Sequence, residues 1–551
     1  MIRAVRGGLA CLALAIPAAG CPTALGAVPA TIRVGGPSAP GDAKVALVGA
    51  STDLTGRAFR VIGGSGSVVL RGRLTRSGGR KAPWRHVMRA DLTRLRTPGA
   101  YTVEVGALRS RHWVVRTRAL SAPIAAILRF FAANADGREP SPAHAPAHLN
   151  DAVVSSGPHA GERFDLTGGW MDAGDMLKFT NTTAFVAAAL QAAARLDPDD
   201  AARLTTAADV GVRWLVKAHP ATDLFIAQVG DERDHELGFR DPASDDSSGK
   251  PGIARRLAYP NMGGDIGGKA AAALGLAAQR ASGAQRDALL TQARQWYAAG
   301  KASGGPAPKL PASVGDFYIA DTSADALAAG AAVLWRETGE QAFIDDAIGF
   351  IGQITPDGRL MWNAMAGFAA ADLCGVLGAP PVPDATARAV ACDALAAQGA
   401  VAVARSRLEA FGTPGDFSWG QTADNAGGGA ITALAARARR LPGGRAIATA
   451  ARDWMLGRNP WGASFVTGYG PNAPRHPHHW ASMSGPGRPV GAVVGGPAPL
   501  KDILAQGFGV PRRSVFSVGA ATYEDRLADY VTSEPAIDYS VASILLLATL
   551  R

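Results

Sequence analysis

The sequence predicts a small all-β sandwich followed by a large, mainly helical domain. Between residues 30 and 117, short β-branched runs alternate with Gly and Pro at the spacing of a sandwich. From about Ser121 onward, the apolar residues change to a helical period and recur in about twelve Ala- and Leu-rich segments. A chain of 551 residues is long enough for two such domains and a large core.

The first 27 residues have the pattern of a signal peptide. Arg3 and Arg6 precede an apolar run, 9–16, that is too short to span a bilayer. We therefore expect export to the periplasm or the outside of the cell, with cleavage near Ala27. Residues 18–21 form an imperfect lipobox, so lipid attachment at Cys21 is the less favoured alternative. We predict no transmembrane helix elsewhere in the chain.

The composition is that of a globular protein, because 47% of the residues are hydrophobic and 19% are charged. The chain has 56 Lys and Arg residues against 46 Asp and Glu residues, which gives a net charge of +10. The basic residues are scattered, and no dense basic run carries the aromatic residues that stack on nucleotides. We therefore predict no nucleic-acid partner.

The predicted sandwich covers residues 28–117. We expect it to pack on the helical domain and to carry no chemistry of its own. Its predicted strands are 31–34, 44–48, 59–62, 68–70, 101–105 and 112–115.

The helical domain is expected at 118–551. Twelve helices suit an α/α barrel of six helical hairpins, although periodicity alone also allows a solenoid of helix pairs. The loops carry most of the Trp, His and Gly residues, so we expect function to lie on the loops. The predicted helices are 124–133, 182–195, 201–219, 269–281, 287–299, 324–337, 341–354, 363–377, 386–411, 426–440, 446–457 and 539–550.

The chain has four cysteines, of which Cys11 and Cys21 lie in or at the predicted signal peptide. Cys374 and Cys392 lie on adjacent helical segments. Their placement permits a disulfide in an oxidising compartment but does not require one.

Three stretches carry candidate chemistry, and the first is the Gly-rich segment 168–179. It places Asp172 and Asp175 three residues apart behind a Trp. Two close carboxylates repel each other unless a water, a cation or a substrate hydroxyl lies between them. A helix N-terminus would explain one Asp but not the pair.

The second stretch, 459–479, offers imidazole and aromatic side chains on a Gly-rich loop. These groups suit hydrogen bonds to sugar hydroxyls and stacking on pyranose rings. Zinc binding is the second interpretation, because no Cys or carboxylate lies nearby in the sequence. The third stretch, 529–540, places Glu534 before a helix, where it could also be a simple cap carboxylate.

Together these stretches resemble glycoside hydrolase family 9, the inverting β-glucanases. Residues 168–179 resemble its GGWYDAGD-x-x-K-[YF] segment, and 459–470 resemble NP-x-G-x-SFV-x-G-[YF]G. Residues 529–540 resemble DYV-x-NE-x-AIDYNA, with Ser533 and Ser540 in place of the two Asn. Residues 228–235 resemble QVG-x-G…DH. Residues 91–101 resemble the end of the immunoglobulin-like domain that precedes many family 9 catalytic domains.

The resemblance implies an (α/α)6 barrel after an immunoglobulin-like sandwich. It also implies cleavage of β-1,4-glucosidic bonds in cellulose-type glucans or cello-oligosaccharides, with inversion. Asp175 would be the general base, Asp172 its partner on the same water, and Glu534 the general acid. We expect backbone N–H groups and Lys178 to keep Asp175 ionised. The apolar residues 535–537 should raise the pKa of Glu534.

The same resemblance indicates the substrate-binding residues. His235 belongs to the DH pair, and His478 is preferred over His479 as the histidine that contacts the sugar. Trp480 stands where the family has Arg, and we expect it to line the cleft as a stacking surface in place of a cationic donor. The remaining candidates are two aromatic residues, Trp419 in a segment similar to WGSN and Tyr469 in the SFV-x-G-[YF]G segment.

No cofactor is needed for this chemistry. Ala147-His148 stands where many family members have a Cys-His zinc pair, so we expect no structural zinc, while calcium elsewhere is left open. The expected partner is a β-glucan or oligosaccharide, and the chain is expected to be monomeric. We lean to soluble chains over crystalline cellulose, because no cellulose-binding module is evident after the catalytic domain. Two alternatives are a non-catalytic carbohydrate-binding surface protein and an exo-acting glucosidase or glucosaminidase.

Overall fold

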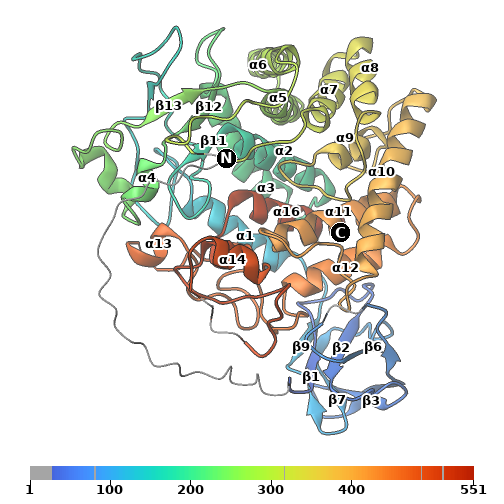
Figure 1. The fold of residues 1–551 in the computed structure, drawn as a ribbon. Coiled ribbons are helices and arrows are strands. Elements are labelled where there is room, and N and C mark those ends of the chain that lie inside the picture. The colour runs from blue at the N-terminus through green and yellow to red at the C-terminus, as the bar shows by residue number, and fades with distance from the viewer. Residues whose placement is uncertain (1–27, 80–81, 316, 486, 510, 512–513) are drawn as a thin grey trace, which may run out of the picture.

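The computed structural model describes residues 28–551 except 80–81, 316, 486, 510 and 512–513. The predicted signal peptide, with Cys11 and Cys21, lies outside the described residues. The described chain forms a β-sandwich and a larger helical domain, which lie side by side in Figure 1.

The sandwich consists of two mainly antiparallel sheets. The first has the strand order β1 (Thr31–Arg33), β2 (Val45–Ala50), β6 (His86–Asp91) and β5 (Thr75–Arg76). The second has the order β4 (Val68–Arg73), β3 (Ala58–Gly63), β7 (Gly99–Val105) and β8 (Leu108–Arg109), and β9 (Trp113–Val115) also pairs with β7.

Strand β6 was not among the strands that the sequence predicts, although it lies inside the first sheet. Its charged residues, Arg89 and Asp91, are exposed, while Met88 and Ala90 are buried in the sandwich core. Met88 stands opposite Val48 of β2 in the register of the sheet. The alternation is therefore present, but it is carried by residues with low strand preference.

In the described residues, twelve helices have eight or more residues, and they form a closed barrel of six pairs (Figure 1). Each inner helix packs on the next, and the last packs on the first, which excludes the open solenoid and confirms the predicted barrel. The inner helices are α2 (Thr180–Leu196), α5 (Gly264–Ala278), α7 (Ala324–Thr338), α9 (Ala366–Leu373), α11 (Gln421–Arg437) and α16 (Ile537–Thr549). The outer helices are α1 (Ser121–Ala133), α3 (Ala201–Lys217), α6 (Gly283–Ala302), α8 (Gln341–Ile351), α10 (Ala385–Ser406) and α12 (Gly444–Met455).

The inner helices are rich in Ala and Gly because their backbones lie close together. A Cβ atom at Gly268 of α5 would lie 2.3 Å from the backbone of Ala326 in α7, so only glycine fits there. The outer helices are amphipathic instead. For example, α3 buries Leu204, Ala208 and Leu215 against the barrel, and its other face meets solvent.

Helix α10 is long and apolar enough to span a bilayer by length and composition, although the sequence analysis predicted no such segment after the first 27 residues. Core helices pass the same test, and α10 packs on α9 and α11 of the barrel. Its Cys392 forms a disulfide with Cys374 at the end of α9, as the sequence permits.

The sandwich packs on the barrel beside α12 (Figure 1). The Trp84 ring lies 6.3 Å from the Phe411 ring across this interface. Arg452 of α12 is fully buried there and donates hydrogen bonds to Asp42 at 2.5 Å and to Asp453 at 2.7 Å. The interface therefore holds both an apolar cluster and a buried ion pair.

Short elements in the barrel loops were not predicted. A third sheet has the order β10 (Val153–Val154), β13 (Leu257–Pro260), β12 (Ile226–Val229) and β11 (Lys178–Phe179). It joins the segment after Asp175 to the segment before His235, since Lys178 pairs with Val229. The remaining short helices are α4 (Arg233–Glu236), the 3-10 helix η1 (Pro242–Ser247), α13 (Trp480–Met483), α14 (Leu500–Ala505) and α15 (Tyr530–Ser533).

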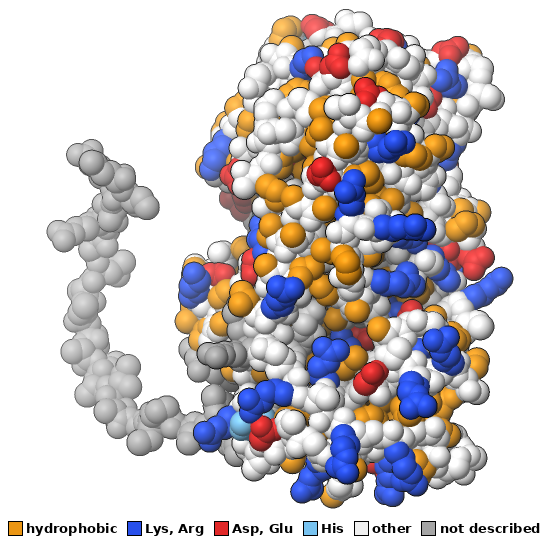
Figure 2. Space-filling model, turned by 90° about the vertical axis from the view of Figure 1, so that its right-hand side faces the viewer, with side chains coloured by type: hydrophobic (Ala, Val, Ile, Leu, Met, Phe, Trp, Pro, Cys, Tyr) orange, Lys and Arg blue, Asp and Glu red, His pale blue; other side chains and the backbone are white. Residues whose placement is uncertain are grey.

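The Lys and Arg side chains on the face drawn in Figure 2 are dispersed among hydrophobic and uncharged groups. That face shows no compact basic patch, in line with the scattered basic residues of the sequence.

Candidate active site

The three stretches that the sequence singled out meet at a cleft of about 910 Å³. Asp172, Asp175 and Glu534 all line this cleft. The loops that carry them are bound to each other through the backbone, because the Ile537 N–H donates to the Asp172 carbonyl at 2.9 Å. Residues more than 350 positions apart are thereby placed in one site.

Asp175 is held by two donors. The Leu177 N–H donates to its Oδ1 at 3.0 Å, and His235 Nε2 lies 2.8 Å from its Oδ2. Its side chain keeps 14% of its surface exposed, so it remains open to the cleft. The prediction that Lys178 stabilises Asp175 is wrong, since Lys178 is buried and pairs with Asp136 and Asp151 instead.

His235 lies between two carboxylates. Its Nε2 faces Asp175, and its Nδ1 lies 3.2 Å from Glu232 Oε2. Burial lowers the pKa of His235, but the hydrogen bonds and charges of Asp175 and Glu232 outweigh burial and raise that pKa to about 10. At neutral pH this side chain is therefore a cation that donates from both nitrogens.

Asp172 lies deeper than Asp175 and is almost fully buried. The Thr182 hydroxyl donates to its Oδ1 at 2.5 Å, and the Tyr318 hydroxyl donates to its Oδ2. Burial, followed by the charge of Asp538, raises the pKa of Asp172 well above its ordinary value. The two Asp residues of the segment therefore have different surroundings, which is the condition for different roles.

Glu534 contacts the Asp172–Asp175 turn although it is distant from that turn in the sequence. The Gly174 N–H donates to Glu534 Oε1 at 3.3 Å. A Cβ atom at position 174 would lie 2.2 Å from the His478 carbonyl oxygen, so the turn requires glycine there. Burial, and then the charge of Asp175, raises the pKa of Glu534 well above its ordinary value. The shift favours the protonated form of the carboxyl group, which is the form that can donate a proton.

The two adjacent histidines have different places. His478 lines the cleft, and its Nδ1 lies 2.7 Å from the Leu527 carbonyl, which leaves Nε2 as an acceptor. Burial lowers its pKa. His479 is fully buried, bonds Asn134 through Nε2 at 2.9 Å, and does not line the cleft. The structure thus places the preferred histidine, His478, at the cleft.

Aromatic side chains form much of the remaining wall. Trp419 lines the cleft and is 43% exposed, although its ring stacks on Tyr530 with a centroid distance of 5.6 Å. Sequence reasoning missed Tyr318 and Trp362, whose rings meet edge to face at 5.0 Å. Both lie in loops without a local motif, and nothing in the flanking sequence indicates them.

Two of the predicted substrate-binding residues do not present an open ring to the cleft. Trp480 belongs to the cleft wall, but its side chain is buried beside Met171 and Met176 and offers no open face. Tyr469 does not line the cleft. It is half-buried, packs on the barrel core, and bonds the Arg116 side chain near the end of the sandwich.

Comparison with known proteins follows this geometry. Residues 122–547 match the family model described as glycosyl hydrolase family 9. The chain belongs to glycosyl hydrolase family 9. Residues 39–110 match the model of the cellulase N-terminal immunoglobulin-like domain.

Relatives of this family 9 chain carry the name endoglucanase. Endoglucanase 14 of Arabidopsis thaliana is 26% identical over 465 residues, which cover 74% of this chain and 89% of that protein. A metagenome-derived family 9 endoglucanase structure has a TM-score of 0.79 and 26% identity, covering 95% of this chain and 99% of that one. A thermostable endoglucanase mutant from Alicyclobacillus acidocaldarius has a TM-score of 0.80 and 24% identity, with the same coverage. The last likeness supports the fold alone.

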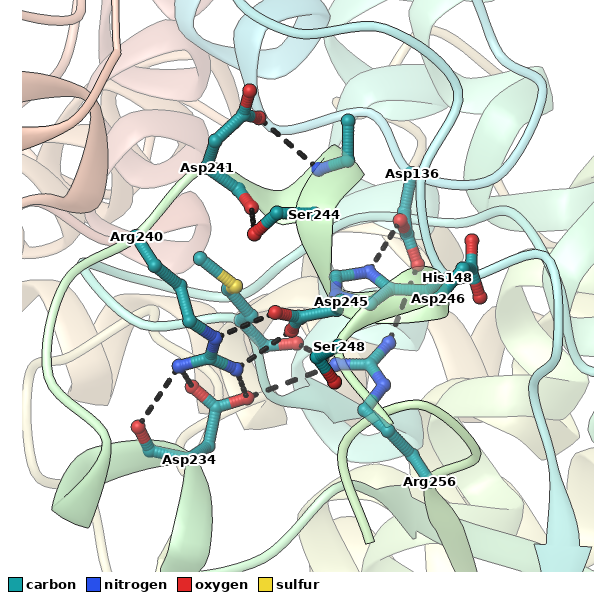
Figure 3. A network of polar contacts seen from close by, with 12 residues as sticks. Asp136, His148, Asp234, Arg240, Asp241, Ser244, Asp245, Asp246, Ser248 and Arg256 are labelled. Atoms are coloured by element: carbon teal, nitrogen blue, oxygen red, sulfur yellow. Dashed lines mark hydrogen bonds and ion pairs between the residues drawn. The ribbon is translucent and has the colours of Figure 1, made fainter. Parts of the chain in front are cut away.

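Beside the cleft, this family 9 protein has a buried ion network, part of which is drawn in Figure 3. Lys178 Nζ lies 2.8 Å from Asp136 and 2.7 Å from Asp151. Arg256 lies 2.7 Å from Asp151 and donates to the Met176 carbonyl at 2.5 Å. The network therefore fixes the backbone of the segment that carries the two catalytic candidates.

His148 joins the network to η1. Its ring nitrogens lie 2.8 Å from Asp136 and 3.3 Å from Asp245, and Arg240 lies 2.6 Å from Asp245. Burial and the charge of Arg256 lower the pKa of His148, but the two carboxylates outweigh them and raise it. Among the residues that the structure describes, no group of three or more His, Cys, Asp or Glu side chains is arranged to hold a metal. His148 is held here by ion pairs.

Proposed function

We propose that this family 9 protein hydrolyses β-1,4-glucosidic bonds of cellulose-type glucans or cello-oligosaccharides with inversion of the anomeric carbon. The observation that carries the proposal is the cleft with one carboxyl group of strongly raised pKa, Glu534, and one more open carboxylate, Asp175. An inverting hydrolase needs one acid and one base on opposite faces of the sugar ring. The names of the relatives support the choice of substrate.

In the proposed reaction, Glu534 gives its proton to the glycosidic oxygen while the bond from that oxygen to the anomeric carbon breaks. A water attacks the opposite face of the carbon and gives a proton to Asp175 as the new bond forms. Such enzymes separate the two carboxyl groups by about 6.5–9.5 Å to leave room for the water. Solvent then restores the proton to Glu534 and removes it from Asp175.

Asp172 has a supporting role in this proposal. Its oxygens already bind the Thr182 and Tyr318 hydroxyls, which fix the direction of its carboxyl group. It shares the Gly-rich turn with Asp175 and lines the same cleft, so it can hold the attacking water on its second side. The residues supply both proton transfers, and the proposal assigns no step to a metal or an organic cofactor.

The substrate is expected to be neutral and extended. Trp419 offers exposed indole surface to a sugar ring, and His478 offers an unprotonated nitrogen to a sugar hydroxyl. The proposal includes export of the chain as a monomer that meets its glucan outside the cytoplasm, since the first 27 residues have the pattern of a signal peptide.

The test is the anomer released first. Proton NMR during the first minutes of cello-oligosaccharide cleavage should show the α-anomer before mutarotation. A β-anomer would overturn the single-displacement mechanism and the assignments of Asp175 and Glu534. Binding of the oligosaccharide without any release of reducing sugar would favour the non-catalytic carbohydrate-binding alternative.

A further inference from the structure

Glu232 is a third carboxylate on the path from the cleft wall to the general base. It precedes the short helix α4, and its side chain is 38% exposed in the cleft. Its Oε2 lies 3.2 Å from His235 Nδ1, and the other nitrogen of that ring lies 2.8 Å from Asp175 Oδ2. The three side chains thus form a carboxylate–imidazole–carboxylate row that ends on Asp175.

The chemistry of imidazole decides what this row does. A neutral imidazole has one N–H, so it can donate to one carboxylate only, whereas the cation donates to both. Asp175 and Glu232 are the two carboxylates that bond the ring, and the Phe317 ring packs edge-on against it at 5.3 Å. Glu534 and His478 also face the ring, since its charge lowers the pKa of both. Both N–H groups are therefore occupied by carboxylates before a sugar arrives.

Glu232 is also a departure from the family pattern that this segment resembles. In the pattern QVG-x-G, to which residues 228–232 are similar, glycine takes this position, and glycine has no side chain to hold the imidazole. Without a carboxylate at Nδ1, His235 would be free to lose its proton and to turn away from Asp175.

We propose that Glu232 is a positioning residue, which holds the imidazolium of His235 on Asp175 and thereby fixes the orientation of the general base. The proposal rests on the function proposed above for Asp175. Glu232 does not touch the reacting atoms. It acts through His235.

The experiment compares Glu232→Gln with Glu232→Asp and with Glu236→Gln. The Gln side chain keeps the size of Glu232 but removes its charge, and Asp restores the charge on a shorter chain. Glu236 is the last residue of α4, is exposed, and serves as the matched control. Nitrogen-15 NMR gives the titration midpoint of His235. Initial rates on an aryl β-cellobioside with a good leaving group give kcat and KM without dependence on the acid.

In Glu232→Gln, the midpoint of His235 should fall by about one pH unit or more from its value of about 10. At pH 9.5 the imidazole would then be mostly neutral, and kcat should drop about threefold or more, with KM within about twofold. At pH 6, where the ring is charged in all variants, kcat should stay within about twofold of the wild type. Glu232→Asp should recover most of the loss, and Glu236→Gln should behave as the wild type.

The proposal is overturned if the midpoint of His235 is the same in Glu232→Gln and Glu236→Gln. It is also overturned if the kcat ratio of variant to wild type is equal at pH 6 and pH 9.5. The NMR titration needs no turnover. If the wild-type chain released no sugar from any β-1,4-glucan, the proposed function would fail, while the midpoint alone would still decide whether Glu232 holds His235.

Discussion

The carboxyl groups of the buried ion network and those of the cleft have pKa values that are shifted in opposite directions. In the buried network, Asp136 and Asp151 face Lys178 and Arg256 at ion-pair distance. Although burial alone would raise the pKa of both carboxyl groups, the cations outweigh it and lower the pKa of each. In the cleft, no Lys or Arg lies among the described lining residues, and burial raises the pKa of Asp172 and Glu534.

The difference shows how one fold separates structure from chemistry. Carboxylates with cationic partners stay ionised, and their cost of burial is offset by ion pairs and hydrogen bonds. Buried carboxyl groups without such partners hold their protons more tightly, which is what an acid catalyst requires. The segment 172–178 belongs to both groups, because it carries Asp175 at one end and Lys178 at the other.

The largest expected effect comes from the open carboxylate of the cleft. Asp175→Asn should lower kcat by about 10²–10⁴-fold on all substrates, since the attacking water loses its base. The fold should persist, because Asp175 is partly exposed and its loss leaves no buried charge unpaired. Azide should restore part of the rate by replacing the activated water. Asp393→Asn on the exposed face of α10 is the control and should keep full activity. A variant of Asp175 with wild-type kcat would remove this residue from the mechanism.

The proton donor of the cleft should show an effect that depends on the leaving group of the substrate. Glu534→Gln should lower kcat on cello-oligosaccharides by about 10²–10⁴-fold, because their leaving oxygen needs the proton. Aryl glycosides with good leaving groups need no proton, so their kcat should fall much less. The measurement is the slope of log kcat against the pKa of the leaving phenol, which should become steeper in the variant. Equal losses on both kinds of substrate would contradict the role of acid.

Substitutions in the buried ion network should change the stability of the protein. Lys178→Met leaves the buried carboxylates Asp136 and Asp151 short of one cation, so the free energy of unfolding should fall by about 3–5 kcal/mol. Lys178→Met combined with Asp151→Asn restores the charge balance and should cost less than the sum of the two single changes. Denaturant unfolding measures both.

Lys217→Met is the matched control for this experiment. Lys217 bonds Asp165 at the surface, and such pairs contribute about 0–1 kcal/mol. If the two lysine variants lost the same stability, the network would not be a stabilising structure, and the contrast with the cleft would fail.

The twelve barrel helices were predictable because the helical period of the apolar residues can be recognised within each segment alone. The three motif loops were predictable because Asp172, Asp175 and Glu534 stand in distinctive segments. The periodicity did not show whether the helices close into a barrel or form an open solenoid. The resemblance predicted the closed barrel, and the packing of α16 on α2 confirms it.

The network could not be predicted, because its partners are far apart in the chain. Asp136 and Arg256 are 120 residues apart, and a lone Asp or Arg in a loop is indistinguishable from a solvated one. The same limit explains the wrong partner for Lys178, which is close to Asp175 in sequence but points the other way. It also explains Tyr318, which reaches Asp172 from a loop 146 residues away.

The pH dependence of stability should sharpen the contrast further. The folded-state pKa of His148 is raised, so its contribution is fully present below the unfolded value of about 6.5 and is lost as pH rises through the folded-state pKa. The unfolding free energy of the wild type should therefore decline over that range, and His148→Gln should remove this part of the decline. His112→Gln, at an exposed site of the sandwich, is the control. A decline of equal size in His148→Gln would show that His148 does not carry the charge.

The smallest expected effect concerns the charge of the substrate. The described residues that line the cleft include five carboxyl groups and no Lys or Arg, and the His235 cation is already bound by two carboxylates. A carboxymethyl group on the glucan would find no cationic partner there, although the whole chain has a net charge of +10. At about 0.15 M salt the Debye length is about 8 Å, so charges elsewhere on the surface are screened. Under these conditions kcat/KM should be a few-fold lower for carboxymethylated than for neutral soluble glucan.

Met361→Lys adds a cation to the cleft wall and should bring kcat/KM for the two glucans closer together, whereas Met361→Gln should not. A preference for the carboxymethylated chain in the wild type would mean that the long-range field of the surface, and not the charge of the cleft, selects the substrate.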